Sequence, residues 1–385
     1  MDFQLTRKQE ILRNSLRDFL AGECTSEYIR MIDEKEEFPF DLFYKFAKLG
    51  FMALPFPVEY GGAGGNTVDL CIANEEVSRY GGSVMNTLTG TMMFALGSIY
   101  SYGSEEQKKK YLPLVSKGEL IVSYALTEPN AGSDAASLTT SAVKDGNDYI
   151  VNGNKIFITR AHVADYIITV TRTDPTLSKH KGLTVFMIDR KSPGITINPL
   201  KKLGHKAVHS CVVFFENVRV PQEMMLGGLN QGWGNMIKHL DVERVVSGAG
   251  SLGHAQGALD LSLDYAKKRE QFGHPIGSYG VIQHYLADMA TRVEASRWMV
   301  YRAAWMESQG VRCSKECSMA KYYSSEVATY VANKGMQIMG GYGYTMDYDM
   351  QRFYRECKMA EVAGGSTEMQ KYIIAREMGL PRTNY

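Results

Sequence analysis

The pattern of apolar residues changes twice along the 385-residue chain, and this change constrains the fold more than any other feature. Before residue 120 and from about residue 232 onward, apolar side chains recur at helical spacing. Between these parts the chain consists of short β-rich runs without the helical crossovers that a parallel sheet needs. We therefore expect an α+β fold with an N-terminal helical domain (1–120), a middle β-sandwich or barrel domain (121–231) and a C-terminal four-helix bundle (232–385).

Apolar spacing and turn residues place individual elements within this outline. Asn152-Gly153 stands between two β-rich runs, and we expect a hairpin turn there because Asn-Gly is a strong hairpin signal. Further strands are expected at residues 166–171, 183–188, 195–197 and 211–215, and long helices at about 236–268, 282–308 and 314–339.

One motif in the last third resembles a dinucleotide-binding fingerprint. Gly248 to Gly253 fits G-x-G-x-x-G, which in a Rossmann unit follows a strand and opens a helix. Here the preceding residues, HLDVERVVS, continue a helical pattern. We therefore expect these small residues to form a close-packing face of a bundle helix, and we do not predict an NAD-binding unit.

Charge and cysteine content exclude several classes of function. The 43 basic and 42 acidic residues nearly cancel, so no basic surface predicts nucleic-acid binding. Six cysteines show no zinc or disulfide spacing, and Cys313 and Cys317 are expected to be two reduced thiols on one helix face. With neither a signal peptide nor a run of about 20 apolar residues, we expect a cytoplasmic protein, or one of another reducing matrix compartment, without membrane insertion.

The stretch from Tyr124 to Asp134, YALTEPNAGSD, indicates a ligand-binding loop. An apolar run at 121–126 ends there and a polar cluster begins. Gly132 lets the backbone approach a ligand closely, while Thr127 and Ser133 supply neutral donors. Such a loop suits a polar planar ring with a phosphate tail.

Four later motifs accompany this loop: KIFIT at 155–159, KKREQFGHPIGSYGVIQ at 267–283, QIMGGYG at 337–343, and RECK followed by AGGSTEMQ at 355–370. Their types and order resemble the acyl-CoA dehydrogenase family, which removes two hydrogens from acyl-CoA thioesters using FAD. In that family Arg269, Gln271 and Phe272 match residues that bind the FAD of a neighbouring subunit, and Phe157 often matches a tryptophan. The resemblance implies the cofactor-binding residues Tyr124, Leu126, Thr127, Gly132, Ser133, Phe157, Thr159, Arg269, Gln271, Phe272, Gln283, Gln337, Gly340, Gly341, Ser366, Thr367 and Glu368.

The chemistry needs a base for the weakly acidic α-proton of a thioester. In many family members this base is a glutamate, and the matching position here is Gly364. A second branch, of the isovaleryl-CoA dehydrogenase type, carries the glutamate on a helix of the C-terminal bundle, where Glu243 stands in LDVER. We interpret Glu243 as the base and the Gly364 N–H as the oxyanion donor. The alternative is that Glu243 is a helix-surface acid paired with Arg244 or Lys238.

The resemblance implies substrate contacts at Ser133, Asp241, Arg244, Gly365 and Thr91. It also implies dehydrogenation of an acyl-CoA to the 2-enoyl-CoA, with electrons passed to an electron-transfer flavoprotein, by a homo-oligomer that is usually a tetramer. The sequence is also similar to crotonobetainyl-CoA reductase, so the reverse reaction stays open. A third alternative is a non-catalytic acyl-CoA-binding flavoprotein, and the acyl chain itself is not predicted.

Overall fold

The computed structural model describes residues 4–237 and 240–381, apart from the side chains of residues 89–96 and 235. The N-terminal part contains α1 (Arg7–Glu23), α2 (Ser26–Lys35), α3 (Phe40–Lys48), α4 (Thr67–Ser78), α5 (Gly82–Phe94), the π-helical turn η3 (Ala95–Tyr100) and α6 (Glu105–Ser116). The middle part contains β1 (Val122–Ala125), β2 (Ser141–Asp145), β3 (Asp148–Thr159), β4 (Tyr166–Arg172), β5 (Leu183–Asp189), β6 (Ile195–Pro199), β7 (Ser210–Pro221) and β8 (Met225–Leu226).

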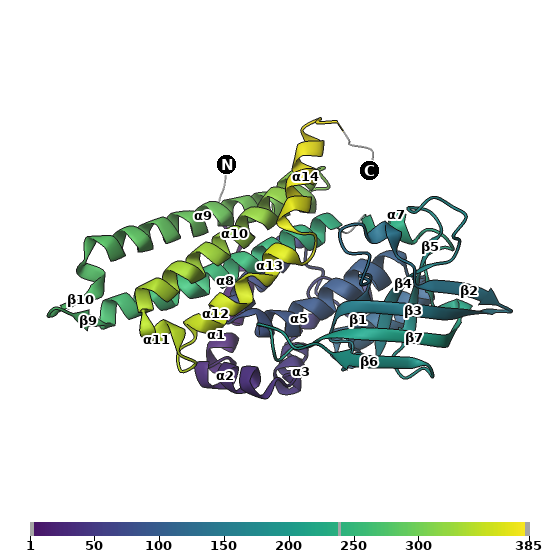
Figure 1. The fold of residues 1–385 in the computed structure, drawn as a ribbon, viewed down its shortest axis with the longest axis horizontal. Helices are drawn as coiled ribbons and strands as arrows, with labels where there is room; N and C mark the ends of the chain where they lie inside the picture. The colour runs from purple at the N-terminus through teal and green to yellow at the C-terminus, as the bar shows by residue number, and fades with distance from the viewer. Residues whose placement is uncertain (1–3, 238–239, 382–385) are drawn as a thin grey trace.

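The C-terminal part is helical again apart from one short hairpin. It contains α7 (Gly232–Ile237), α8 (Leu240–Lys268), the hairpin β9 (Glu270–Gln271) and β10 (His274–Pro275), α9 (Gly280–Ser308), α10 (Ser314–Met339), α11 (Gly341–Tyr344), α12 (Met350–Cys357), α13 (Met359–Val362) and α14 (Thr367–Glu377). The predicted succession of helical, β and helical parts is confirmed, and Figure 1 shows the β-part at one end of the elongated molecule.

The strands of the middle part form one curved sheet. Within the described residues its order is β6-β7-β3-β2-β4-β5-β8, and β1 pairs with β4 in parallel. The long neighbours, such as β3 with β7 and β4 with β5, are antiparallel. One apolar cluster lies on the face that includes Val151, Phe186 and Phe215, and a second lies between the other face and α6. The expected strands at 166–171, 183–188, 195–197 and 211–215 are all present.

The predicted hairpin turn at Asn152-Gly153 is wrong. These two residues lie inside β3, at a register shift opposite β7, and Gly153 has a φ of 141°. The β2–β3 turn is formed by Gly146 (φ 63°) and Asn147, just before β3. The Asn152 amide bonds Asn217 on β7, where its Oδ1 accepts the Asn217 N–H at 2.8 Å. The Asn-Gly pair therefore forms a β-bulge, which uses the same freedom of glycine as a turn does.

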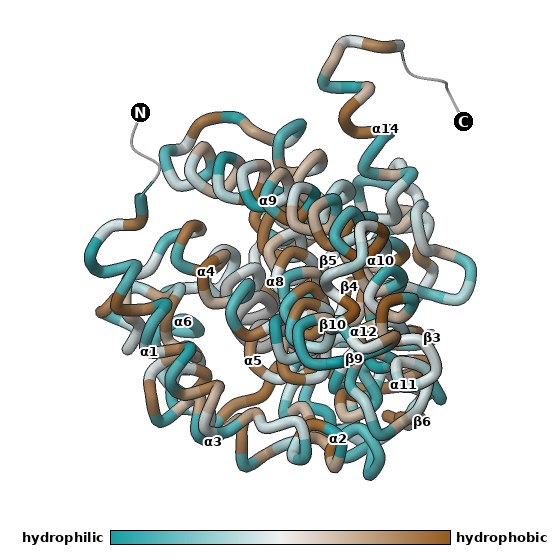
Figure 2. The backbone as a smooth tube through the Cα atoms, turned by 90° about the vertical axis from the view of Figure 1, so that its left-hand side faces the viewer, coloured by the Kyte–Doolittle hydropathy of each residue, from teal (hydrophilic) through white to brown (hydrophobic). Residues whose placement is uncertain are grey.

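The N-terminal helices and the C-terminal bundle share one apolar core rather than two. Leu16, Phe43 and Leu70 of the first part belong to the same buried cluster as Leu252, Val293 and Val331 of the second. Figure 2 views this assembly from its helical end, with α8 in the middle and α4, α9 and α10 around it. The sheet therefore rests against a single helical body, and the ligand site can form where the two meet.

The glycines of the G-x-G-x-x-G motif lie within α8, as expected for a packing face. A Cβ at Gly253 would stand 2.1 Å from the backbone oxygen of Glu75 on α4, and one at Gly250 would meet Met85 Sδ at 2.7 Å. Small residues thus let α4 and α8 approach closely. All six cysteines are free and buried, and the Sγ atoms of Cys313 and Cys317 lie 3.5 Å apart. In the part of the chain that the structure describes, each helix is too short or too polar to cross a membrane.

Candidate active site

The loop after β1 is held in place by a buried ion pair. The carboxylate of Glu128 accepts hydrogen bonds from the Thr139 N–H (2.7 Å), the Thr140 N–H (2.8 Å) and the Lys155 ammonium (2.9 Å). Lys155 also donates to the carbonyl of Leu126 at 3.0 Å. Burial alone would raise the pKa of Glu128, but Lys155 and the hydrogen bonds outweigh it and hold that pKa at about 2. Burial lowers the pKa of Lys155 to about 8, so both groups are charged at neutral pH.

The same loop is joined to the end of β3, where two further predicted residues lie. The Ile156 N–H donates to the Thr127 carbonyl at 2.9 Å, and the Ser123 hydroxyl donates to the Thr159 carbonyl at 2.7 Å. Phe157, between Ile156 and Thr159, has a positive φ of 62° at a second register shift of β3. The residue is 64% exposed. The structure therefore brings Leu126, Thr127, Phe157 and Thr159 together. An exposed aromatic face beside polar loop groups suits the binding of a flat polar ring such as flavin.

Glu243 lies near the start of α8, close to this loop. Its side chain is exposed, yet burial among protein atoms raises its pKa above the ordinary value, with Arg244 and Lys321 acting to lower it. Both observations fit a carboxylate that has protein atoms around it and is still reached by solvent. Burial, with a contribution from the charge of Glu243, raises the pKa of Tyr102 and of Tyr124, which places both phenols near the carboxylate.

Arg244 forms an ion pair with Asp241, which also lies in the first turn of α8. Its Nη1 donates to Asp241 Oδ1 at 2.6 Å, and the Ser314 hydroxyl donates to Asp241 Oδ2 at 2.5 Å. This arrangement does not support the alternative that Arg244 neutralises Glu243 as a surface pair. The second partner of that alternative, Lys238, lies outside the described residues.

Gly364, which matches the position of the base in many family members, lies in the turn between α13 and α14. It has a φ of 62°, and no atom outside its immediate neighbours lies within 4 Å of where a Cβ would stand. Gly365 follows with a φ of 79°. Ser366 caps α14 by accepting the Met369 N–H, and Thr367 and Glu368 form the first turn of that helix. Open space at Gly364 leaves room for the carboxylate of another residue. Lys321 of α10 is buried beneath this turn. The charge of Glu243 acts to raise the pKa of Lys321, so Glu243 also lies near the turn.

A second group of predicted cofactor residues lies at the other end of the bundle. Arg269, Gln271, Gly340 and Gly341 line an open hollow of about 570 Å³, with Ile338 and Tyr342 among its other walls. Phe272 projects from the β9–β10 hairpin with 92% of its side chain exposed, and Gln283 and Gln337 are exposed on α9 and α10. Figure 1 shows this hairpin and α11 far from the sheet, so one chain does not bring the two groups together.

The two regions together fit FAD. The loop offers Gly132 and Ser133, both exposed, and a Cβ at Gly132 would meet no atom within 4 Å. The distant hollow offers the Arg269 guanidinium for a pyrophosphate and glycines that permit close approach. Thr91 lies in α5, but its side chain is outside the described part, so its role in the acyl pocket stays a prediction.

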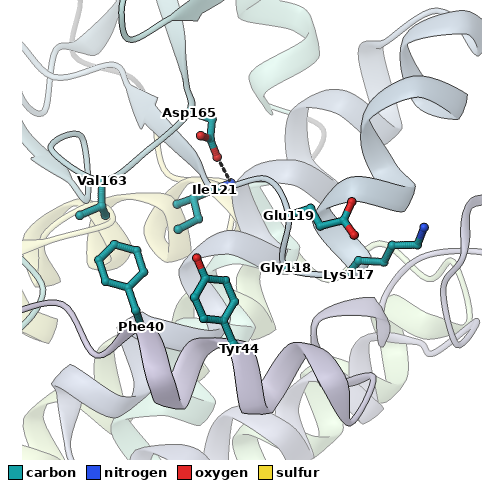
Figure 3. A pocket seen from close by; sticks show the side chains of 8 residues that line it. All are labelled: Phe40, Tyr44, Lys117, Gly118, Glu119, Ile121, Val163 and Asp165. Carbon is teal, nitrogen blue, oxygen red and sulfur yellow. Dashed lines mark hydrogen bonds between the residues drawn. The ribbon is translucent and has the colours of Figure 1, made fainter.

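Another hollow, of about 400 Å³, lies between α3 and the segment before β1 (Figure 3). The rings of Phe40 and Tyr44 form one wall, and Asp165 accepts the Ile121 N–H at 2.8 Å on the other side. It contains none of the predicted site residues. We assign it no part in the chemistry.

Comparison with known proteins agrees with this fold. Family models match the chain in three consecutive parts: the acyl-CoA dehydrogenase N-terminal domain at residues 6–119, the middle domain at 123–218 and the C-terminal domain at 230–379. A probable acyl-CoA dehydrogenase of Bacillus subtilis, YngJ, is 38% identical, over 98% of this chain and 100% of that protein. Subunit CarC of the caffeyl-CoA reductase-Etf complex of Acetobacterium woodii is 38% identical, over 96% of this chain and 98% of its own.

Among solved structures, butyryl-CoA dehydrogenase from Megasphaera elsdenii matches with a TM-score of 0.94 and 33% identity, covering 98% of this chain and 100% of that one. The fold and the site thus define a flavin-dependent oxidoreductase that acts on CH–CH groups. The chain belongs to the acyl-CoA dehydrogenase family, whose members depend on FAD.

Sequence reasoning missed three residues that shape the site: Glu128, Lys155 and Lys321. Glu128 and Lys155 lie within two of the motifs named above, but the sequence analysis assigned roles only to neighbouring residues of those motifs. Lys321 carried a signal of its own, because it falls on the buried stripe of α10 that includes Cys317, Ser324 and Ala328 at helical spacing. A lysine on such a stripe needs acceptors inside the protein.

Proposed function

We propose that the protein is an acyl-CoA dehydrogenase in which Glu243 removes the α-proton of an acyl-CoA thioester. The observation that carries this proposal is the combination of Glu243, whose pKa is raised by surrounding protein atoms although solvent reaches it, with the open space at Gly364. Bound cofactor and acyl chain would exclude water from the carboxylate, so burial would then govern the pKa of Glu243. A base with a raised pKa is better matched to a weakly acidic carbon.

The residues of this chain divide the remaining tasks. When bound, FAD supplies the acceptor for the hydride that leaves the β-carbon as the α,β double bond forms. Glu243 takes the α-proton, and the Gly364 N–H stabilises the negative charge that develops on the thioester oxygen. Arg244 and Asp241 hold each other beside the base, and we assign them to substrate placement. Phe157 and Thr159 support the flavin ring from the end of β3.

We further propose a homo-oligomer, a tetramer by resemblance, in which each site is completed by a second chain. The separation between the flavin loop and the hollow at Arg269 supports this proposal, because one FAD cannot bridge both ends of a single chain (Figure 1). Arg269, Gln271 and Phe272 would then bind the FAD of the neighbouring chain. The redox partner that we propose is an electron-transfer flavoprotein, and the relative that forms part of an Etf complex supports it.

The reverse reaction is the second candidate, because one relative is a subunit of a caffeyl-CoA reductase complex. The same carboxyl group would then deliver a proton to the α-carbon of an enoyl-CoA. Anaerobic titration of the holoenzyme with saturated and unsaturated acyl-CoAs, followed by the flavin absorbance, separates the two. Bleaching by a saturated thioester supports the dehydrogenase. Reoxidation of chemically reduced enzyme by an enoyl-CoA alone supports the reductase.

The same titration with Glu243→Gln tests the role of the base. We expect FAD and acyl-CoA to bind and the flavin to stay oxidised. Near-normal bleaching by this variant would remove Glu243 from the mechanism. Spectral shifts without redox change in the unmodified protein would instead favour the non-catalytic acyl-CoA-binding flavoprotein.

A further inference from the structure

Lys321 uses its whole hydrogen-bonding capacity on one turn. Its side chain is fully buried in α10, and its ammonium donates to the carbonyls of Ala360 (2.8 Å), Ala363 (3.0 Å) and Gly365 (2.7 Å). A lysine ammonium has three N–H groups, and here each finds a backbone acceptor. Burying a lysine is costly, so this contact is a specific feature of the turn between α13 and α14.

The bond to Ala363 has a direct consequence for the proposed oxyanion donor. The Ala363 carbonyl and the Gly364 N–H belong to one peptide group, which is planar and, in its trans form, points its oxygen and its hydrogen in opposite directions. Holding the oxygen with the ammonium therefore fixes the direction of the N–H. The same bond polarises the peptide group and makes its N–H a stronger donor.

The side chain of Gln370 supports the same turn, where its amide also lies 3.4 Å from the Gly364 carbonyl oxygen. Gly364 and Gly365 both have positive φ values and carry no side chain that packs. Besides Lys321, the Gln370 amide donates to the Gly365 carbonyl at 3.0 Å. Glycine residues lose the most conformational freedom on folding, so the position of this turn depends on contacts made to its carbonyl groups.

Charge links Lys321 to the base as well. Burial lowers the pKa of Lys321 to about 8, while the nearby carboxylates of Glu243, Glu361 and Glu368 act to raise it. Glu243 in turn is faced by Arg244 on its own helix, by Lys321 on α10, and by the phenols of Tyr102 and Tyr124. A positive charge at Lys321 therefore favours the ionised form of Glu243.

We propose that Lys321 is a positioning residue for the reaction: its ammonium orients the Gly364 N–H toward the thioester oxygen and stabilises the carboxylate of Glu243. The inference rests on the proposed function of this site and adds a residue that touches neither substrate nor cofactor. It predicts that replacing Lys321 weakens the hydrogen bond to the bound thioester carbonyl, lowers kcat and shifts the acid limb of the pH profile.

The test uses the FAD-loaded oxidised enzyme with crotonyl-CoA labelled with ¹³C at C1, a probe that oxidised flavin leaves unreacted. The carbonyl stretching frequency reports the strength of the hydrogen bonds to the thioester oxygen. In the unmodified protein we expect the band below its frequency in water. In Lys321→Met we expect the band to return toward that frequency, and kcat to fall roughly 10- to 100-fold with a smaller change in KM.

The pH profile supplies a second readout. Loss of the positive charge in Lys321→Met should move the acid limb of kcat/KM to higher pH, because Glu243 then holds its proton more tightly. Lys371→Met is the matched control, since Lys371 is an α14 lysine paired with Glu326 at 2.9 Å away from the turn. It should leave the carbonyl band, kcat and the acid limb unchanged.

Three outcomes would overturn the proposal: no shift of the carbonyl band in the unmodified protein, an unchanged band and kcat in a folded Lys321→Met, or the same changes in Lys371→Met. Should Lys321→Met not fold, Gln370→Met loosens the turn from its other side and should return the band part of the way. An unchanged band in Gln370→Met would then count against the proposal. Glu243→Gln separates this question from the proposed function, since it should stop turnover and leave the carbonyl band in place.

Discussion

At the scale of single residues, Glu243 and Gly364 explain each other. The proposed function places the Glu243 carboxylate in the space that a glutamate at position 364 would occupy, and a Cβ at Gly364 would meet no atom within 4 Å. The positive φ of Gly364 adds a second reason for glycine, because other residues adopt that conformation only at a cost. The proposed site therefore needs both the carboxylate of Glu243 and the lack of a side chain at Gly364.

The raised pKa of Glu243 gives a prediction whose sign depends on the direction of the reaction. Burial raises this pKa, and Arg244 and Lys321 oppose the rise. Dehydrogenation needs the ionised form, so kcat/KM should increase with pH through a limb that lies above the ordinary glutamate value of 4.5. Enoyl-CoA reduction needs the protonated form, so its rate should fall as pH rises through the same value.

The measurement is the initial rate against pH in both directions, with a flavin-coupled dye as electron acceptor or donor. Glu243→Gln should remove the limb along with most of the activity. A limb at or below 4.5 would contradict the burial argument.

The sequence proposed a candidate site residue where a recognisable motif contained it. It could not predict a contact whose two partners lie far apart along the chain. Glu128 meets Lys155 across 27 positions, and Lys321 meets the turn at Ala363 across 42 positions. Such pairings arise from tertiary packing, which no local pattern records. A lysine on an apolar stripe was visible, but its acceptors were not.

At the scale of elements, the helices were the more predictable part. The expected segments at 282–308 and 314–339 differ from α9 and α10 by two residues at most, because long amphipathic periods fix them. The hairpin at Asn152-Gly153 was wrong because a bulge inside a long strand and a tight turn demand the same residues. The pairing of β3 with β2 and β7 distinguishes them.

The close approach of α4 and α8 predicts a large effect from one methyl group. In Gly253→Ala the new Cβ would stand 2.1 Å from the Glu75 backbone oxygen, and backbone cannot move aside cheaply. We expect a loss of roughly 1–3 kcal/mol in stability, measured as a lower thermal unfolding midpoint. Gly22→Ala is the matched control, because that helical glycine has open space around its Cβ. It should be neutral or stabilise by up to about 1 kcal/mol.

The ion pair between Glu128 and Lys155, which holds the loop after β1, predicts a second stability effect. Glu128→Gln leaves the Lys155 ammonium buried without its counter-charge and should cost roughly 3–5 kcal/mol. The pKa of Glu128 is lowered from 4.5 to about 2, so its contribution is complete above pH 4.5 and is lost as pH falls toward 2. Unfolding midpoints between these pH values should therefore fall steeply in the unmodified protein and less steeply in Glu128→Gln.

Retention of FAD during dilution gives an independent readout of the same change, because Lys155 also holds the Leu126 carbonyl. Glu216→Gln, on an exposed position of β7, is the control and should behave as the unmodified protein. Equal FAD retention and equal acid stability in Glu128→Gln would show that the pair does not support the loop.

At the scale of the whole molecule, the arrangement of the cofactor residues was beyond prediction from residue order. The motifs at 124–134 and 267–283 are recognisable one by one, but their separation in space follows from the length and direction of α8, which runs between them for 29 residues. A helix of that length spans about 43 Å at 1.5 Å per residue. If both groups bind FAD, as we propose, a second chain must turn its hairpin toward the first chain's loop.

This arrangement predicts complementation between two inactive variants. Glu243→Gln removes the base of its own site, and Arg269→Glu would repel the pyrophosphate bound by its neighbour. In a mixed pair, the chain with intact Glu243 receives intact Arg269 from its partner, so one of the two sites is complete. Refolding or co-expressing the variants in equal amounts should restore about a quarter of the unmodified activity, because half of the pairs are mixed and each has one working site.

Each variant alone supplies the control, since both sites of a uniform pair carry the same defect. If FAD were bound by Arg269 of its own chain, every chain in the mixture would carry one lesion in its own site and no activity would return. Flavin content shows that the mixed pairs have formed with cofactor, because they should hold about half of the FAD in either arrangement. Mixed pairs that retain about half of the bound FAD without activity would therefore refute the shared site, whereas loss of FAD from the mixed pairs would show that the two variants do not assemble into a cofactor-binding pair.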